Sequence, residues 1–388
     1  MNDLKFETLA IRSQLKKSSF NEHSAPLYLT SSFVFDDAEQ MRAMFADEIE
    51  GNIYSRFSNP NTTELIEKIC LLEGAEAGWA TASGMSAVFT TFGSLLKQGD
   101  HLLSCKSIFG STHNVISKIL PKWGIDYSYF DVNNISDLEK LIQPNTKIIF
   151  IETPTNPVLD VLDLAYIGEI CKKRNLIFIV DNCFATPYIQ QPIKFGADLV
   201  IHSATKYLDG QGRVVGGLIA GKKSLINEIQ AFARHSGPSM SPFNAWIISK
   251  SIETLAIRME KHCENALKVA QFLETHNHVL SVKYPFLPSH PQYAIAKKQM
   301  KLGGGLVAFE IKGGIEAGKK FLNQIQWFSL TANLGDVRTI VTHPASTTHS
   351  KLSAEERLET GITDGLIRIS VGIENIDDIL EELNNALN

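Results

Sequence analysis

The chain has 388 residues, of which 44% are hydrophobic and 20% charged, and its formal net charge is −5 at pH 7. This balance is typical of a soluble globular protein and excludes a disordered chain. The acidic balance argues against a nucleic-acid partner, because phosphate backbones are bound mainly through an excess of Lys and Arg. We therefore expect a small-molecule partner.

The five cysteines lie far apart without a CxxC pair, so the sequence predicts neither a zinc site nor a disulfide framework. The N-terminal residues lack the apolar core of a signal peptide, and no apolar run approaches the roughly 20 residues of a membrane span. We expect a cytoplasmic protein with no bound metal and no membrane partner.

In chain order, the sequence predicts three regions. Residues 1–55 are irregular and are expected to form an N-terminal arm that reaches another subunit. Residues 56–250 are expected to form a large α/β domain, because short apolar runs alternate with amphipathic stretches, as in βαβ units around a mostly parallel sheet. Residues 251–388 are expected to form a smaller C-terminal α/β domain.

Within the large domain, three runs that are apolar nearly throughout predict central strands covered by helices on both faces. These runs are 147–153, 176–181 and 197–203. Residues 162–175 have helical spacing and predict a crossover helix. Residues 244–276 keep a helical period without Gly or Pro and predict one long helix. Strands are expected at 303–311 and 365–374, followed by a C-terminal helix.

Two reactive side chains follow neighbouring predicted strands, at the edge where open α/β sheets bind ligands. Asp181 ends one strand, and Lys206 follows the next, flanked by the hydroxyls of Ser203 and Thr205. Pyridoxal phosphate needs a lysine for its aldehyde, an acid for its ring nitrogen and donors for its phosphate. The sequence therefore indicates this cofactor. The alternative is that Asp181 caps a helix and Lys206 lies on the surface.

A strand-to-helix turn is predicted at Ser83, Gly84 and Met85, and such a turn presents backbone N–H groups to an anion. We expect it to bind the cofactor phosphate, although an ordinary tight turn would fit the same three residues. Nucleotide motifs are excluded: 216–222 matches GxxxxGK, but Lys223 stands where the motif requires Ser or Thr.

Taken together, the motifs resemble those of the Cys/Met-metabolism pyridoxal-phosphate enzymes, also called the trans-sulfuration enzymes. The resemblance runs almost end to end and rests on seven ordered blocks. These are YSRFSNPN at 54–61, ATASGMSA at 80–87, ETPTNP at 152–157, VDNCFATP at 180–187, HSATKYLDGQGRVVGG at 202–217, HPASTTH at 343–349 and LIRISVGIE at 366–374. The resemblance implies the fold of this family, a large domain with a mostly parallel sheet and a smaller C-terminal domain.

The resemblance also implies roles for single residues. Lys206 matches the lysine that holds the cofactor and moves protons, and Asp181 matches the partner of the ring nitrogen. The other residues implied to contact the cofactor are Ser83, Gly84, Met85, Phe109, Cys183, Ser203 and Thr205. Tyr54 and Arg56 match residues that reach the phosphate of a neighbouring subunit. A homo-oligomer built as a dimer of dimers, with shared active sites, is therefore expected.

The residues implied to bind the substrate are Asn156, Arg338, Thr339 and Arg368. Asn156 and Arg368 match groups that bind the α-carboxylate, a role suited to the planar guanidinium. For Arg368 the alternative is a surface salt bridge. Arg338 stands where cystathionine-handling relatives commonly carry Glu, which disfavours cystathionine as a substrate.

Departures from the wider family narrow the expected reaction. Phe109 stands where many members have a Tyr that stacks on the cofactor and can act as an acid. Cys183 replaces a common Thr, and a small buried cysteine is the simpler account of it. Gln211 and Arg213 replace a frequent His and Asp, which resembles the O-succinylhomoserine sulfhydrylases.

We therefore expect γ-replacement on O-succinyl-L-homoserine by sulfide, giving homocysteine and succinate in methionine biosynthesis. Alternatives within the family are cystathionine γ-synthase, O-acetylhomoserine sulfhydrylase and γ-lyase activities. An alternative of another class is a non-catalytic binding protein on the same fold.

Overall fold

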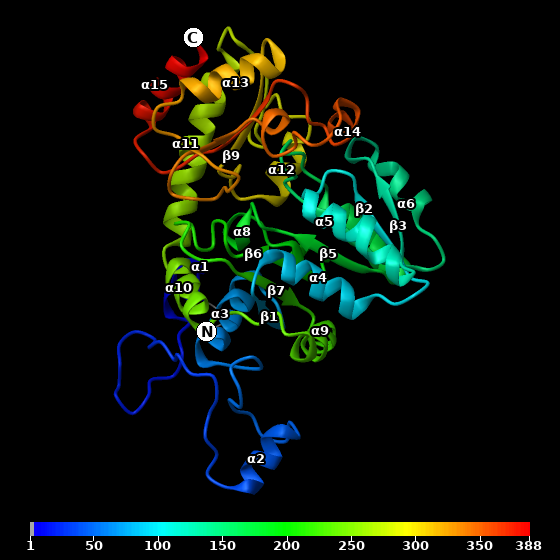
Figure 1. Cartoon of the computed structure of the whole chain (residues 1–388), viewed down its shortest axis with the longest axis vertical. Helices are drawn as coiled ribbons and strands as arrows, with labels where there is room; N and C mark the ends of the chain where they lie inside the picture. Colours follow the sequence, from blue (N-terminus) through cyan, green and yellow to red (C-terminus); the bar gives the residue numbers. More distant parts are fainter. Residues whose placement is uncertain (1–3) are drawn as a thin grey trace.

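The computed structural model describes residues 4–388 and contains two β-sheets, arranged one above the other in Figure 1. The first three residues of the predicted arm lie outside the described part of the chain. The larger sheet has seven strands in the order β1 (Ala77–Thr81), β7 (Gly217–Gly221), β6 (Leu199–Ser203), β5 (Ile177–Asp181), β4 (Thr146–Glu152), β2 (His101–Cys105) and β3 (Asp126–Phe130).

The three strands predicted to be central occupy the middle of this sheet as β6, β5 and β4. Their pairings are parallel, and only β7 runs antiparallel to its neighbours. The mostly parallel α/β fold predicted from the sequence is therefore confirmed. Both faces are buried because one hydrophobic cluster joins the sheet to α4 (Gly84–Leu95) and α9 (Lys223–Ser236), and a second joins it to α3 (Pro60–Glu73).

The predicted crossover helix is present as α7 (Leu164–Arg174), which begins at the Asp163 cap. The predicted single helix over 244–276 is wrong, because two helices occupy this stretch: α10 (Pro242–Ile252) and α11 (Leu255–Glu274). The helix is interrupted between them. Here the Ser251 carbonyl accepts hydrogen bonds from the Thr254 amide and, at 2.9 Å, from the Arg258 guanidinium. A side chain thus replaces the helical donor.

The smaller sheet has five strands in the order β10 (Ser329–Leu330), β11 (Ile340–Thr342), β12 (Leu366–Ser370), β9 (Leu306–Ile311) and β8 (Val279–Lys283). Its expected strands at 303–311 and 365–374 correspond to β9 and β12. Helix α11 rises from the large sheet to the small one, where it packs with the C-terminal helix α15 (Ile376–Leu387).

The remaining helices are short. They are α1 (Phe6–Arg12), α2 (Ala38–Phe45), α5 (Gly110–Asn114), α6 (Leu138–Leu141), α8 (Thr186–Ile189), α12 (Tyr293–Gln299), α13 (Gly314–Gln324) and α14 (Ala354–Glu359). Among residues 4–388, no helix combines the length and the apolar character needed to cross a membrane.

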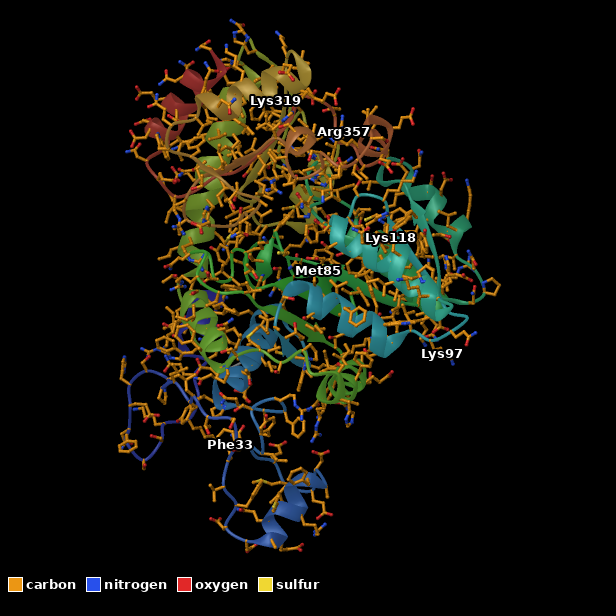
Figure 2. All side chains as sticks on the ribbon, viewed as in Figure 1. Phe33, Met85, Lys97, Lys118, Lys319 and Arg357 are labelled. Carbon is orange, nitrogen blue, oxygen red and sulfur yellow. The ribbon has the colours of Figure 1, made fainter. Side chains whose placement is uncertain are left out.

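The N-terminal arm extends away from the two sheets and carries α2 at its far end (Figure 1). Its apolar side chains are unusually exposed, with Phe20 at 90% and Val34 at 99% of their full accessible surface. Figure 2 shows the separation, with Phe33 on the arm and Met85 beside the large sheet.

Candidate active site

The candidate site lies where β4, β5 and β6 end. Glu152 and Asp181 are register partners at the last positions of β4 and β5, and Ser203 ends β6. Lys206 follows three residues later, where its backbone N–H donates to the Ser203 carbonyl at 3.1 Å. The parallel direction of the strands therefore brings an acid and an amine to one sheet edge, as the sequence predicted.

Asp181 is a poorly solvated carboxyl. Burial raises its pKa to about 6, although the Cys183 backbone N–H, 3.0 Å from Oδ1, and the charge of His202 oppose the shift. A carboxyl in this state gains strongly from a cationic partner, because such a partner restores the interactions that burial removed. Asp181 can thus hold a protonated ring nitrogen.

Glu152 is a second buried carboxyl beside Asp181, and the sequence reasoning gave it no role. Burial, followed by the negative charge of Asp181, raises its pKa well above the ordinary value. The available signal was its position, since Glu152 ends an apolar strand one strand away from Asp181.

Lys206 carries an amine whose pKa lies below the ordinary value of a lysine. Burial lowers its pKa, and the positive charge of Arg368 adds to this effect. The Nζ atom donates a hydrogen bond to Oδ1 of Asn333 at 2.6 Å. A lysine with a lowered pKa has more of the free amine that attacks an aldehyde. Asn333, which the sequence reasoning did not single out, fixes the position of this amine.

Arg368 is 6% exposed, so the alternative of a surface salt bridge is wrong. Its Nη1 donates to Oδ1 of Asn156 at 2.9 Å, and its Nη2 lies 3.3 Å from the Asn333 carbonyl. Its Nε has no acceptor within the described residues, and burial lowers the pKa of the guanidinium to about 10. The two predicted carboxylate-binding residues therefore lie together, with a donor left over for an anion.

The predicted anion-binding turn is present as the start of α4. Ser83 caps this helix, and Gly84 and Met85 belong to its first turn, whose N–H groups have no acceptors within the helix. Gly84 lies so close to β6 that a Cβ there would be 2.7 Å from the Cβ of Ser203. The amides at the start of α4 and the Ser203 hydroxyl thus face the same small space.

Three further predicted cofactor contacts surround this space. The Thr205 hydroxyl accepts from the Gly216 amide at 3.2 Å, which fixes its orientation. Cys183 packs by its thiol against the Ser203 carbonyl at 3.6 Å. Phe109 precedes α5, and its ring remains 44% exposed. An aromatic ring with free surface at this edge can stack on a planar ligand.

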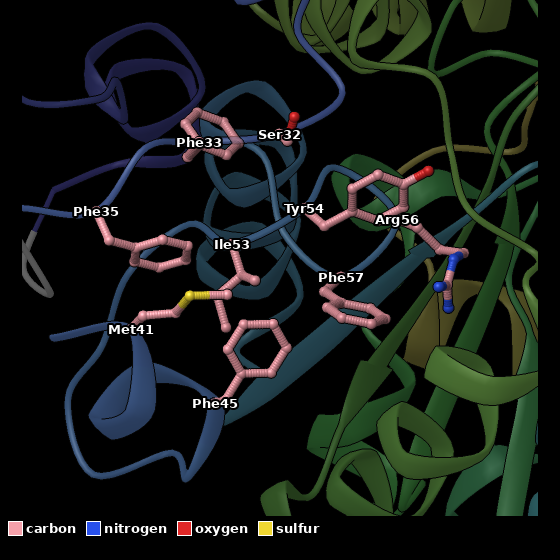
Figure 3. A pocket seen from close by; sticks show the side chains of 9 residues that line it. All are labelled: Ser32, Phe33, Phe35, Met41, Phe45, Ile53, Tyr54, Arg56 and Phe57. Carbon is pink, nitrogen blue, oxygen red and sulfur yellow. The ribbon is translucent and has the colours of Figure 1, made fainter. Parts of the chain in front are cut away.

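Tyr54 and Arg56 lie apart from Lys206 and contact other residues in this chain. The Arg56 guanidinium lies 4.6 Å from the centre of the Phe57 ring and donates to the Arg234 carbonyl. Figure 3 shows both side chains at one side of an apolar hollow on the arm. A role at the site of another subunit remains a prediction.

The last two predicted substrate contacts form hydrogen bonds within the protein. Arg338, whose side chain is 61% exposed, pairs with Asp336 at 2.8 Å and donates to the Gln211 carbonyl at 2.8 Å. Thr339 is buried, and its hydroxyl donates to Glu374 at 2.8 Å. Gln211 thus contacts Arg338 through its backbone carbonyl and not through its side chain. Arg213 instead pairs with Asp209 (N–O distance 2.8 Å), so one ion pair joins the first and last residues of the DGQGR segment.

These residues fit pyridoxal phosphate. The site offers an amine of lowered pKa, a carboxyl of raised pKa that gains from a cation, helix-start amides for a phosphate and a guanidinium nitrogen without an acceptor among residues 4–388. Each feature meets one chemical need of the cofactor or of its amino-acid substrate.

Comparison with known proteins agrees with this fit. The family model of the Cys/Met metabolism PLP-dependent enzymes matches residues 7–388. The chain is 44% identical to an O-succinylhomoserine sulfhydrylase of Pseudomonas aeruginosa, over 98% of this chain and 95% of that protein. It is also 44% identical to an L-methionine γ-lyase of Porphyromonas gingivalis, over 98% and 96%. A crystal structure from Campylobacter jejuni, which contains N′-pyridoxyl-lysine-5′-monophosphate, is similar with a TM-score of 0.95 and 36% identity, over 99% of this chain and 100% of that one.

Replacing Asp181 by Asn should stabilise the protein without cofactor while weakening cofactor binding. Because the pKa of Asp181 is raised, its ionisation costs stability as the pH rises through about 6, and no cost exists below its ordinary pKa. We expect Asp181→Asn to increase the free energy of unfolding of the apoprotein at pH 8 by on the order of 1–2 kcal/mol, with no gain at pH 4. Urea unfolding at both pH values, with and without pyridoxal phosphate, measures this difference.

Asp198→Asn is the matched control. Asp198 accepts from the Phe178 amide at 2.7 Å and pairs with Lys222 at 2.5 Å, so an amide at this position loses an ion pair. This variant should lose stability at pH 8. An equal loss in Asp181→Asn would contradict the assignment.

Proposed function

The chain belongs to the Cys/Met metabolism PLP-dependent enzymes, and we propose that it replaces the γ-substituent of O-succinyl-L-homoserine by sulfide. The products are homocysteine and succinate, which places the reaction in methionine biosynthesis, in the cytoplasm. The observation that carries the choice of reaction is Phe109, an aromatic residue at the cofactor-binding edge that has no ionisable hydroxyl.

The proposed division of labour follows the geometry. Bound pyridoxal phosphate supplies an electron-withdrawing ring that absorbs negative charge from the substrate carbon. Arg368 and Asn156 bind the α-carboxylate and orient the amino acid. Lys206 moves protons between substrate carbons, and Asn333 keeps its Nζ within reach between these steps. Asp181 keeps the ring nitrogen protonated.

The leaving group distinguishes replacement on an ester from cleavage of methionine. Succinate leaves as a stable carboxylate and needs little help from an acid. Methanethiol is a much weaker acid than succinic acid, so its departure as a thiolate benefits from a proton donor in the transition state. Phe109 can stack on the ring but cannot donate that proton. The site therefore suits an activated ester better than a thioether.

Several alternatives remain within the same family. A γ-lyase is supported by relatives as similar as the sulfhydrylase, and O-acetylhomoserine differs from the succinyl ester only in its acyl group. Cystathionine γ-synthase would need to bind the ammonium group of cysteine. The residue at position 338 is Arg, which cannot pair with an ammonium group as a Glu could. A non-catalytic binding protein would have no use for a lysine of lowered pKa and a carboxyl of raised pKa at the same sheet edge.

We also propose that the active site is shared between subunits of a homotetramer. Tyr54 and Arg56 lie where the arm joins the large domain, and the arm exposes apolar side chains such as Phe20 and Val34 in the single chain. Covering these side chains with a second copy would remove apolar surface from water. It would also bring a guanidinium to a neighbouring phosphate.

With O-succinylhomoserine and equal concentrations of sulfide and cysteine, homocysteine should exceed cystathionine, and methionine alone should be cleaved more slowly. Phe109→Tyr should raise methionine cleavage by about 10-fold or more, within the range that a positioned acid supplies. Phe20→Tyr, on the arm, is the control and should leave the ratio unchanged. Product analysis by chromatography distinguishes the outcomes. An excess of cystathionine, or rapid methionine cleavage by the wild type, would refute the proposal.

Arg56→Ala and Lys206→Ala should each be inactive when pure. If the sites are shared, refolding the two together gives mixed dimers in which one site carries both defects and the other carries neither. Activity should then return to a fraction of the wild-type value. Mixed dimers that form, as shown by native mass spectrometry, but stay inactive would exclude the shared site.

A further inference from the structure

Glu152 is a buried carboxyl at the candidate site to which the proposed mechanism assigns no step. It is 5% exposed and lies next to Asp181 at the ends of β4 and β5. Burying a carboxyl costs free energy unless hydrogen bonds or opposite charges compensate it. The partners that compensate Glu152 therefore indicate what it does.

Those partners belong to two different loops of the site. Oε2 accepts the backbone N–H of Phe109 at 2.7 Å, and the backbone amide of Asn156, on the loop that follows Glu152, opposes the rise that burial causes in the Glu152 pKa. Phe109 reaches this point from the end of β2, and Asn156 follows β4 itself. One carboxyl thus holds together the loop with the stacking ring and the loop with the carboxylate-binding amide.

A third contribution comes from the C-terminal sheet. The positive charge of Arg368, on β12, also stabilises the Glu152 carboxylate. Arg368 donates to Asn156 at 2.9 Å, so the charge and the loop that Glu152 holds belong to one recognition unit. Movement of Glu152 would therefore disturb both the ring contact and the substrate contact.

We propose that Glu152 is a positioning residue that fixes the Phe109 loop relative to the Asn156–Arg368 pair. Through it, the stacking ring and the carboxylate-binding groups keep one spacing, set by the reach of a single side chain. This inference rests on the site proposed above, but it does not depend on which ester or thioether is the substrate.

The direct readout is backbone hydrogen exchange, measured by mass spectrometry on peptides covering 106–115 and 153–160. Glu152→Ala removes the acceptor, so exchange in both peptides should accelerate. The dissociation constant of pyridoxal phosphate and the KM for the amino acid should each rise about 10-fold, as for one lost buried hydrogen bond. The kcat should fall by a smaller factor. The visible circular dichroism of the bound cofactor should change because its stacking partner shifts.

Glu152→Gln tests the same idea with less disruption, because its amide oxygen can still accept the Phe109 N–H. Exchange, cofactor affinity and KM should stay within about threefold of the wild type. This variant keeps the proposal testable if Glu152→Ala does not fold.

Glu382→Ala is the matched control for stability. Like Glu152, Glu382 is buried (6% exposed) and accepts hydrogen bonds from backbone amides, those of Gln326 and Trp327. It lies on α15, away from the site. Its loss should lower the melting temperature without changing the two peptides, the cofactor affinity or the dichroism.

The inference is overturned if Glu152→Ala leaves exchange in both peptides at wild-type rates, or if only its melting temperature falls, as in Glu382→Ala. It is also overturned if Glu152→Gln is as impaired as Glu152→Ala, because charge rather than positioning would then be responsible. Exchange and cofactor binding need no substrate. A wrong choice of reaction would therefore leave these results intact.

Discussion

The structure depends on burying charged groups of both signs at one edge of the large sheet. Asp181 and Glu152 lie at the strand ends, and Lys206 and Arg368 complete the same region. Burial raises the pKa of the two acids and lowers the pKa of the two bases, so it favours the neutral form of all four groups. Such a site is costly when empty and gains most from a ligand that carries a cation, an aldehyde and anionic groups.

Both sheets are needed to build this region. The large sheet supplies the acids and Lys206, whereas β12 and the loop before β11 supply Arg368 and Asn333. Asn333 joins the two sets, because its side chain accepts from Lys206 and its carbonyl accepts from Arg368. The position of the Lys206 amine is thus linked to that of the Arg368 guanidinium. A substrate that binds Arg368 approaches Lys206 with a defined orientation.

Residues at the ends of apolar strands could be predicted from the sequence, because parallel strands bring their carboxyl ends together. Asp181 and Lys206 follow this rule, and the resemblance to the family added Asn156 and Arg368. Glu152 follows the same rule, but the sequence suggests no separate role for a second carboxylate beside Asp181. Local sequence patterns could not predict contacts between segments that are far apart in the chain. Periodicity could not reveal that Arg258 donates to the Tyr207 carbonyl, and the sequence could not show that Arg338 donates to the Gln211 carbonyl.

The central claim is that Lys206 holds the cofactor, and covalent mapping tests it most directly. The purified protein is saturated with pyridoxal phosphate, reduced with borohydride, digested and analysed by mass spectrometry. The account predicts a single phosphopyridoxyl group on the peptide that contains Lys206, and none in Lys206→Ala. Stoichiometric labelling of a different lysine, or unchanged labelling in the variant, would contradict it.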